Sequence, residues 1–275
     1  MKNIRIKSLI IGAAVAVGAL FSGCSAKTEN VSGGNIEDVT LSKGDLVAEI
    51  EIKDFGTIKA KLFPEAAPVG VENFQKLCES GYYKGKNIHR VVEGFMFQGG
   101  SLNGDGTGGD AAVNGGTFEV EKADNLRHFY GALCYANAGG QNTTQFYIVN
   151  NNKNNTFDSE IEYYKKQMNL CDERIKEYQN AGSSEGVEYF TRVKNTFQNY
   201  INSFEKFPEN VKELYNKRGG TPSLDGNYTV FGQVVEGFDV IDAVSAVEVT
   251  ENAAKEKSVP VKEIIISDIR VSTVE

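Results

Sequence analysis

The sequence is poor in the residues that build metal sites and disulfide frameworks. It has no tryptophan, two histidines (His89 and His128) and four cysteines scattered along 275 residues. Zinc sites need several histidine or cysteine ligands at characteristic short spacings, so the sequence predicts no metal. Cys24 follows the apolar run near the N-terminus, apart from the other three cysteines. The odd number of cysteines that remains, at wide spacing, argues against a disulfide framework.

Positive charge and nucleophile motifs are also scarce. The 29 lysines and arginines are outnumbered by 37 acidic residues, which gives a net charge of −8. A nucleic-acid-binding protein needs a basic face, so we expect no nucleic-acid partner. No serine lies in a G-x-S-x-G turn, and neither histidine has a visible partner for a hydrolase triad.

The apolar run near the N-terminus, LIIGAAVAVGALF at residues 9–21, is short for the about 20 residues of a membrane-spanning helix. A positively charged start, MKNIRIKS at 1–8, precedes it, and the small residues of SGC at 22–24 follow. This pattern is typical of a secretory signal peptide. The cysteine that ends it resembles the lipobox of bacterial lipoproteins, which are cut before the cysteine and carry lipid on it.

This resemblance implies a signal peptide at residues 1–23 and lipidation of Cys24. The protein is then expected to be extracytoplasmic and lipid-anchored to the bacterial cell membrane, with the lipid as its only membrane contact. An ordinary signal peptide followed by a chance cysteine is the alternative. The polar stretch at 24–43 predicts a lipid-anchored flexible tether.

Alternating apolar and polar residues predict strands along much of the chain. Residues 45–53 and 57–62 alternate with period two around a DFG turn, which predicts a hairpin. Helices are expected at 68–81 and 238–247. Further strands are predicted at 87–100, 129–136, 144–149, 228–235 and 262–271. Many short strands with two short helices favour a closed antiparallel barrel.

Residues 151–220 interrupt this pattern. Apolar residues repeat at spacings of three and four over 161–178 and again over 190–204, which predicts two helices with heptad seams. A third short helix is expected within 208–220. We predict a helical hairpin inserted into a loop of the barrel, with a long helix pair packed over the barrel face as the alternative.

A glycine-rich loop resembles two ligand-binding motifs without fulfilling either. GDGTGG at residues 104–109 matches G-x-G-x-x-G, but no helix pattern follows to present amides to a pyrophosphate. As a calcium loop it has Asn114 at the twelfth position, where a bidentate glutamate is needed. The sequence therefore predicts neither dinucleotide nor calcium binding.

An arginine lies within a strand-like apolar run, NIHRVVEGFMFQGG at residues 87–100. Arg90 is either a snorkelling side chain at a barrel rim or a guanidinium directed into an apolar groove. Two later stretches belong with it, GALCYANAGGQNTTQFYIV at 131–149 and TPSLDGNYTVFGQVVEGFDVI at 221–241. Together with FGTIKAKLFPEAAPVGVENFQKLCESGYYKG at 55–85, these blocks resemble the cyclophilin family of peptidyl-prolyl isomerases.

The resemblance covers roughly residues 44–150 and 220–272. It implies a mainly β fold over 44–275, a closed eight-stranded antiparallel β-barrel with two capping helices, interrupted by the helical insertion at 151–220. It also implies isomerisation of proline-containing unfolded or extended polypeptides, and no cofactor is expected. We expect a monomer, although the heptad seams also allow closure between two chains.

The matched residues suit the chemistry of this reaction. Twisting an X–Pro bond abolishes amide resonance and gives the prolyl nitrogen a basic lone pair. A fixed donor that meets this lone pair, or holds the twisting carbonyl, lowers the barrier without bond cleavage. The resemblance assigns this role to Arg90, which stays charged and offers several rigid donors. It assigns Gln98 the positioning of Arg90 and of the substrate carbonyl.

Further matched positions imply a substrate groove. By the resemblance, Phe95, Met96 and Leu224 line an apolar proline pocket. Ala136 and Asn137 match the strand that holds the peptide backbone. The full set of predicted substrate-binding residues is Phe95, Met96, Ala136, Asn137, Gln145, Tyr147, Leu224 and Tyr228.

Three positions depart from the family's pattern. Tyr147 replaces the usual phenylalanine, Ser223 occupies a position that often holds tryptophan, and Tyr228 replaces an expected histidine. These changes bring the turnover rate and the binding of cyclosporin-type inhibitors into question. His89 matches the histidine of the family's His-Arg pair and is expected to be structural.

The leading hypothesis is an isomerase that assists the folding of secreted or surface proteins, because proline isomerisation can limit folding. Ser223 and Tyr228 motivate an alternative, a catalytically weak module that holds peptides in the groove and on the insert. A solute-capturing lipoprotein is disfavoured, because the chain is short for two lobes and no second α/β lobe is visible.

Overall fold

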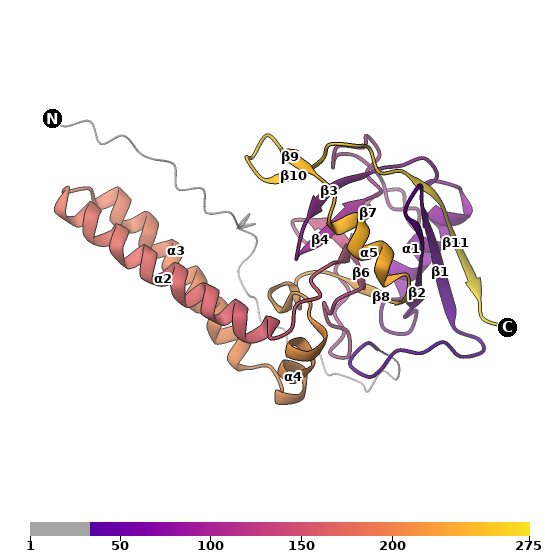
Figure 1. Cartoon of the computed structure of the whole chain (residues 1–275), viewed down its shortest axis with the longest axis horizontal. Coiled ribbons are helices and arrows are strands. Elements are labelled where there is room, and N and C mark those ends of the chain that lie inside the picture. Colours follow the sequence, from indigo (N-terminus) through magenta and orange to yellow (C-terminus); the bar gives the residue numbers. More distant parts are fainter. Residues whose placement is uncertain (1–33) are drawn as a thin grey trace.

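A curled antiparallel β-sheet and a pair of long helices that projects away from it dominate the structure (Figure 1). The computed structural model describes residues 34–275. The predicted signal peptide at 1–23 and the lipidation site Cys24 lie outside the described residues. Within 34–275, no helix combines the length and the apolar character needed to cross a membrane.

The secondary structure alternates between short strands and helices of very different length. The strands are β1 (Leu46–Ile52), β2 (Gly56–Leu62), β3 (Ile88–Val92), β4 (Met96–Gly99), β5 (Phe118–Glu119), β6 (Ala132–Ala138), β7 (Gln141–Val149), β8 (Val230–Glu236), β9 (Val249–Glu251), β10 (Lys257–Pro260) and β11 (Ile266–Thr273). The helices are α1 (Pro68–Glu79), α2 (Thr156–Asn180), α3 (Ser184–Glu205), α4 (Glu209–Arg218), the 3-10 helix η1 (Pro222–Leu224) and α5 (Phe238–Ser245).

The hairpin predicted at 45–53 and 57–62 is confirmed as β1 and β2. Ile50 lies opposite Ile58 in the antiparallel register, and both side chains are fully buried. Asp54 in the connecting turn has a φ of 67°, a left-handed conformation that aspartate tolerates better than most residues. The alternation in the sequence therefore places one side of the hairpin in the core, as period two requires.

The main sheet runs in the order β11-β1-β2-β8-β6-β7-β4-β3, and β5 pairs with β7. The closed barrel predicted from the sequence is wrong. Between 34 and 275, the edge strands β11 and β3 are joined by an isolated bridge between Asn87 and Ile265, rather than by a strand ladder. Beyond this bridge β11 continues along β1, while the hairpin of β9 and β10 lies beside β3. The sheet is therefore an open half-barrel.

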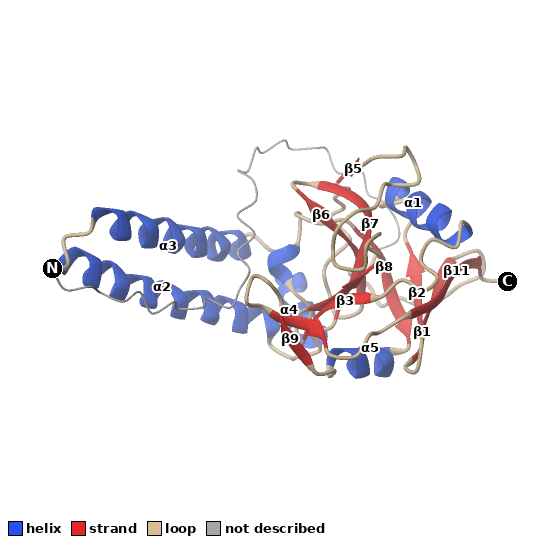
Figure 2. Ribbon diagram, turned by 90° about the horizontal axis from the view of Figure 1, so that it is seen from above, coloured by secondary structure: helices blue, strands red, loops and turns tan. Residues whose placement is uncertain are grey.

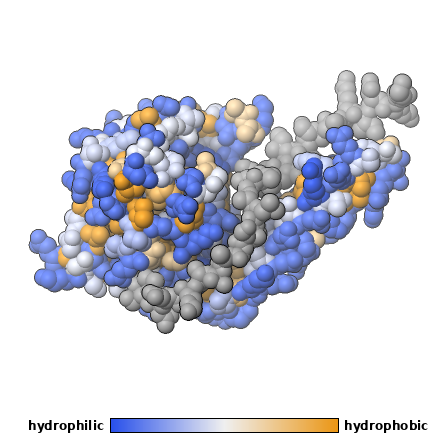
Figure 3. Space-filling view, turned by 180° about the vertical axis from the view of Figure 1, so that it is seen from behind, coloured by the Kyte–Doolittle hydropathy of each residue, from blue (hydrophilic) through white to orange (hydrophobic). Residues whose placement is uncertain are grey.

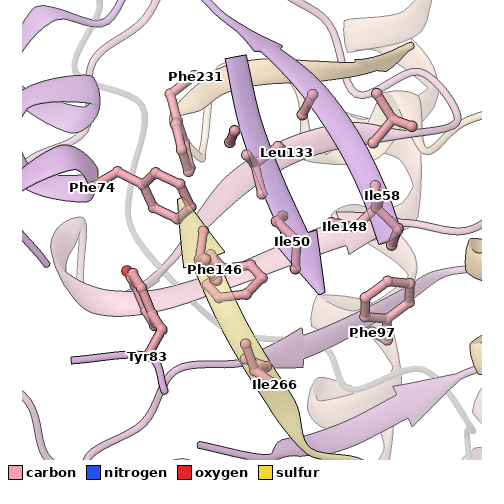
Figure 4. Packing of buried hydrophobic residues seen from close by; sticks show 14 of the residues in the cluster. Ile50, Ile58, Phe74, Tyr83, Phe97, Leu133, Phe146, Ile148, Phe231 and Ile266 are labelled. Atoms are coloured by element: carbon pink, nitrogen blue, oxygen red, sulfur yellow. The ribbon is translucent and has the colours of Figure 1, made fainter. Parts of the chain in front are cut away.

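The core lies against one face of this sheet, and the two capping helices predicted from the sequence are present as α1 and α5 (Figure 2). Phe74 of α1 packs against the rings of Phe146 and Phe231, with ring centroids 5.9 and 5.1 Å apart (Figure 4). Pro68 begins α1, where its missing amide hydrogen costs nothing. Val240 and Ile241 of α5 are buried in the same core.

The helices predicted within 151–220 are present as α2 and α3, followed by the shorter α4. The long helices lie side by side and project from the sheet (Figures 1 and 2). Phe197 and Ile201 of the second seam are buried, and Tyr164 stacks on Phe197 with centroids 5.8 Å apart. At the base, Phe157 and Tyr215 pack in one cluster with Phe129 of the sheet domain. Packing over the barrel face is therefore confined to the base of the insert.

Two segments differ from their sequence-based predictions. The stretch at 87–100 forms two strands, β3 and β4, because the chain turns at 93–95. The hairpin of β9 and β10 was not predicted at all. In addition, Asn35 of the predicted tether is buried, and its side chain accepts a hydrogen bond of 2.7 Å from the backbone amide of Arg127.

Candidate functional site

The site lies on the face of the sheet opposite the main core. Met96 and Tyr147 are buried there in an apolar cluster with Cys134, Val149 and Val230. The partly buried residues packed against this cluster include four of the predicted groove residues, Phe95, Ala136, Leu224 and Tyr228. The structure thus brings together six residues that are spread from position 95 to position 228 of the sequence. We refer to Phe95, Met96, Ala136, Tyr147, Leu224 and Tyr228 as the groove cluster.

Sheet register places the polar residues beside this cluster. Arg90 of β3 lies opposite Gln98 of β4, and Gln98 lies opposite Tyr147 of β7. Their side chains form a chain of hydrogen bonds. Nη1 of Arg90 donates to Oε1 of Gln98 at 3.4 Å, and Nε2 of Gln98 donates to Oε1 of Gln145 at 2.9 Å. Gln145 donates in turn to the carbonyl of Gly106 at 3.0 Å, so the glycine-rich loop supports this chain.

The guanidinium of Arg90 lies at the edge of the groove cluster. Nη1 is 3.9 Å from Sδ of Met96, and Cζ is 5.9 Å from the centre of the Phe95 ring. The side chain keeps 26% of its surface exposed. Arg90 therefore has apolar neighbours on one side and solvent access on the other.

A carboxylate that sequence reasoning missed binds the other edge of the guanidinium. Glu256, directly before β10, accepts hydrogen bonds from Nε and Nη2 of Arg90, each at 2.8 Å. Arg90 holds the pKa of Glu256 below its ordinary value. The sequence carried no signal for this contact, because Glu256 lies 166 residues away in a hairpin without a strand-like pattern.

His89 is directed away from this chemistry. Its Nδ1 lies 3.5 Å from Oγ of Ser101, and Gly106 packs near its ring. Burial, together with the charge of Arg90, lowers its pKa to about 4. The ring is therefore neutral at physiological pH, which agrees with a structural role.

Tyr147 and Tyr228, two of the departures from the family pattern, contact each other. Their rings meet edge to face with centroids 5.9 Å apart, and His128 stacks on Tyr147 at 6.2 Å. Burial raises the pKa of Tyr147 well above its ordinary value, so the phenol stays protonated. Within 34–275 its hydroxyl has no nitrogen or oxygen partner, and the thiol of Cys134 lies against it.

A buried polar cluster supports the loop that carries Leu224. Asp225 accepts hydrogen bonds from the backbone amide of His128 at 3.0 Å and from the hydroxyl of Tyr215 at 2.8 Å. Nδ1 of His128 lies 2.7 Å from the same carboxylate, and Nε of Arg127 lies 3.6 Å from it. Because Tyr215 belongs to α4, the insert is tied directly to the loop of the groove.

The insert also reaches Ser223, the third departure. The carboxyl oxygen Oε2 of Glu160 in α2 is buried, and burial raises the pKa of Glu160 to about 8 against the opposing effect of the Ser223 hydroxyl. Burial likewise raises the pKa of Tyr164, which lies against Ser223 as well. Glu160 and Tyr164 of the insert therefore lie against Ser223, the position at which the family often has a tryptophan.

Asn137 lies near the end of β6 and contacts the segment before Tyr228. Its Nδ2 donates to the carbonyl of Asn227 at 2.9 Å, and its Oδ1 accepts from the amide of Gly140 at 3.2 Å. This contact links the turn after β6 to the residue before Tyr228. A role of Ala136 and Asn137 in holding a peptide backbone stays a prediction. In the described part of the chain, His, Cys, Asp and Glu form no group that could hold a metal ion.

Known proteins resemble this chain in sequence and fold. The family described as "Cyclophilin type peptidyl-prolyl cis-trans isomerase/CLD" matches residues 47–168 and 175–271. A Staphylococcus epidermidis protein named as a peptidyl-prolyl cis-trans isomerase is 33% identical over 217 residues, covering 78% of this chain and 87% of that protein. A Streptococcus pyogenes protein named as a bifunctional phosphatase/peptidyl-prolyl cis-trans isomerase is 35% identical over 219 residues, covering 78% of this chain but 37% of that protein.

A solved structure agrees with the fold. The crystal structure of a Cryptosporidium parvum cyclophilin type peptidyl-prolyl cis-trans isomerase aligns with a TM-score of 0.53 and 21% identity, over 84% of this chain and 99% of that one. The same protein crystallised in the presence of the dipeptide Ala-Pro aligns similarly, with a TM-score of 0.52. Sequence match, relatives and fold agree, and the chain belongs to the cyclophilin-type peptidyl-prolyl cis-trans isomerase family.

Proposed function

We propose that this protein isomerises X–Pro bonds in unfolded or extended polypeptides outside the cytoplasm, with Arg90 as the catalytic donor. One observation carries the proposal. The guanidinium of Arg90 lies at the edge of an apolar cluster, with Nη1 between Gln98 and Met96. A cation beside an apolar cluster with half-buried side chains suits a substrate that combines a proline ring with a polar amide.

The mechanism needs no covalent step. The planar amide resists rotation with a barrier of about 18–20 kcal/mol, and the barrier is highest where resonance is lost. At that point the prolyl nitrogen gains a lone pair, and the preceding carbonyl is free to turn. The N–H groups of Arg90 donate to this nitrogen or to the substrate carbonyl, which stabilises the twisted amide more than the planar one.

The groove cluster supplies the binding energy for the proline ring. Met96 is 2% exposed and Tyr147 is 3% exposed, so they form the floor of the cluster, while Phe95, Leu224 and Tyr228 are half-buried around it. A proline ring that covers these half-buried side chains gains apolar burial at about 25 cal/mol per Å². The ring is thereby held while the chain on its N-terminal side rotates.

The N-terminal pattern supports a location of this activity at the outer face of the bacterial membrane. The motif at 22–24 supports lipidation of Cys24, which would anchor the protein by lipid alone. Newly exported chains fold in this compartment, and uncatalysed prolyl isomerisation takes 10–100 s at 25 °C. An anchored isomerase therefore acts where unfolded substrates emerge.

A refolding assay tests this function. An unfolded substrate protein whose slow phase is limited by a proline is refolded with the wild-type protein or with Arg90→Ala. We expect the wild type to shorten the slow phase and Arg90→Ala to leave it near the uncatalysed rate. An unchanged slow phase with the folded wild-type protein contradicts the proposal.

The alternative is a module that holds peptides without turning them over. The departures at Ser223 and Tyr228 motivate it, but the surface of the insert gives it less support. The exposed large hydrophobic residues of the paired helices are Tyr163, Leu170 and Tyr189, and Figure 3 shows a mostly hydrophilic surface there. Replacing 173–193, beyond the ion pair of Asp172 and Lys194, by a short glycine-rich turn shortens the hairpin but keeps its packed base. Loss of aggregation protection with intact isomerisation would assign holding and catalysis to two separate parts of the chain. Aggregation protection by a folded wild type that does not isomerise peptides would favour the alternative.

A further inference from the structure

The side chains of Arg90 and Glu256 form a two-point ion pair. Nε donates to Oε2 and Nη2 donates to Oε1, both at 2.8 Å, which is the fork geometry in which arginine and a carboxylate fit best. The two side chains keep 26% and 23% of their surface exposed. Solvent therefore screens this pair less than an exposed one, and both the position and the plane of the guanidinium are fixed.

The pair leaves the catalytic edge of the guanidinium available. Arginine carries five N–H donors, and Glu256 occupies one on Nε and one on Nη2. Both N–H groups of Nη1 lie on the other edge, toward Gln98 and Met96. The carboxylate therefore holds Arg90 from behind, on the side away from the groove cluster.

Glu256 is itself held in place by its own hairpin. Its backbone amide donates to Oδ1 of Asn252 at 3.0 Å, and its carbonyl accepts from the amide of Asn252 at 2.8 Å. Nδ2 of Asn252 also lies 3.4 Å from Oε2 of Glu256 and 3.3 Å from Oγ of Ser258. The hairpin of β9 and β10 lies beside β3, which carries Arg90 (Figure 1).

We propose that Glu256 is a positioning residue for the isomerase, and that the hairpin of β9 and β10 holds the Arg90 guanidinium in the orientation that the twisted amide needs. This inference rests on the proposed function of Arg90. Arginine has a long side chain with many rotamers, and fixing a catalytic group before the substrate binds lowers the entropic part of the barrier. Two contacts define this orientation, Gln98 on the groove side and Glu256 behind.

The opposite role makes a different prediction. If the carboxylate restrained Arg90 in an inactive position, the substrate would have to break the pair, and removal of Glu256 would raise the turnover. A positioning role predicts that removal lowers kcat while KM changes little, because the apolar cluster that binds the proline ring stays intact.

Kinetics of the full-length protein with a proline tetrapeptide distinguish these roles. We expect Glu256→Ala to lower kcat about tenfold with KM within about twofold. Glu256→Gln keeps the shape and one acceptor oxygen, so we expect a smaller loss. Glu251→Ala is the matched control in the same hairpin, because Glu251 pairs with the exposed Lys255 and is expected to leave both constants unchanged.

An NMR measurement makes the test independent of turnover. The Nε–Hε signal of Arg90 reports whether the guanidinium is held, and we expect it to be sharp and slowly exchanging in the wild type and broadened in Glu256→Ala. An active wild type whose kcat is unchanged or raised in both Glu256 variants overturns the positioning role alone. A folded wild type without activity overturns the proposed function, and the positioning role with it.

Discussion

The hydroxyl of Tyr215 in the inserted helix α4 donates a hydrogen bond of 2.8 Å to Asp225, the residue that follows Leu224 of the groove cluster. The same hydroxyl accepts a hydrogen bond of 3.0 Å from the backbone amide of His128. His128 in turn stacks on Tyr147. The insert is thus connected to the floor of the groove through one buried phenol.

We expect Tyr215→Phe to destabilise the protein by about 1–3 kcal/mol, because it removes the hydrogen bond that the hydroxyl donates to the buried carboxylate of Asp225. We also expect weaker peptide binding, seen as a raised KM, because Asp225 loses part of its support. Urea unfolding and peptide kinetics measure these effects. Tyr189→Phe, at an exposed position near the far end of the insert, is the control. Equal stability of the two variants would contradict this role of Tyr215.

The buried carboxyl of Glu160 predicts a pH-dependent stability. Its pKa of about 8 in the folded state lies above the ordinary 4.5, so the folded protein binds the extra proton between these values. The stability that this proton contributes is complete below about pH 4.5 and is lost as the pH rises through 8. Glu160→Gln removes this loss, because its side chain has no proton to release.

We therefore expect Glu160→Gln to match the wild type near pH 5 and to exceed its unfolding free energy by about 1 kcal/mol or more at pH 8.5. Glu162→Gln is the matched control on the same helix, since Glu162 is exposed and pairs with Lys166. Thermal or urea unfolding at several pH values measures the difference. A stability difference that does not change with pH would show that the carboxyl of Glu160 is not buried as described.

We expect the protein to tolerate the substitution Tyr147→Phe, because the hydroxyl of Tyr147 is poorly satisfied. The hydroxyl is buried against the Cys134 thiol, without a nitrogen or oxygen partner among the described residues. Tyr147→Phe removes this poorly satisfied group and restores the family's usual residue. We expect the unfolding free energy to stay the same or to rise by about 1 kcal/mol, with kcat/KM within about threefold of the wild type. A loss of more than that would mean that the hydroxyl has an essential partner.

The lipid anchor is testable by fractionation. We expect Cys24→Ala to move the protein from the membrane fraction to the soluble or unprocessed fraction, because lipid can no longer be attached at that position. Ser25→Ala, next to it, is expected to stay at the membrane. A membrane-bound Cys24→Ala protein with a cleaved N-terminus would show that something other than lipid holds it there.

The sequence was sufficient to predict which residues lie on the groove face. It was not sufficient to predict which charged side chains, such as Glu256, contact them. Arg90, Gln98 and Met96 share one face because strands alternate with period two, and that period is visible in the sequence. The pair of Arg90 and Glu256 depends on how the β9–β10 hairpin leans against β3, a tertiary contact without a local pattern. The same hairpin lies beside β3 at the edge of the open sheet, a placement that no local pattern indicates. The contact of Glu160 with Ser223 depends on the direction in which the insert leaves the sheet, which the heptad pattern does not define.

The most direct test of the account is the isomerisation rate of a proline tetrapeptide with the wild type, Arg90→Ala and Arg270→Ala. Arg270 is an exposed arginine of β11 and controls for the loss of a positive charge. We predict that the wild type and Arg270→Ala accelerate isomerisation equally, and that Arg90→Ala loses about a hundredfold or more of kcat/KM while staying folded. A folded Arg90→Ala protein with the activity of the wild type would contradict the central claim that the guanidinium of Arg90 stabilises the twisted amide.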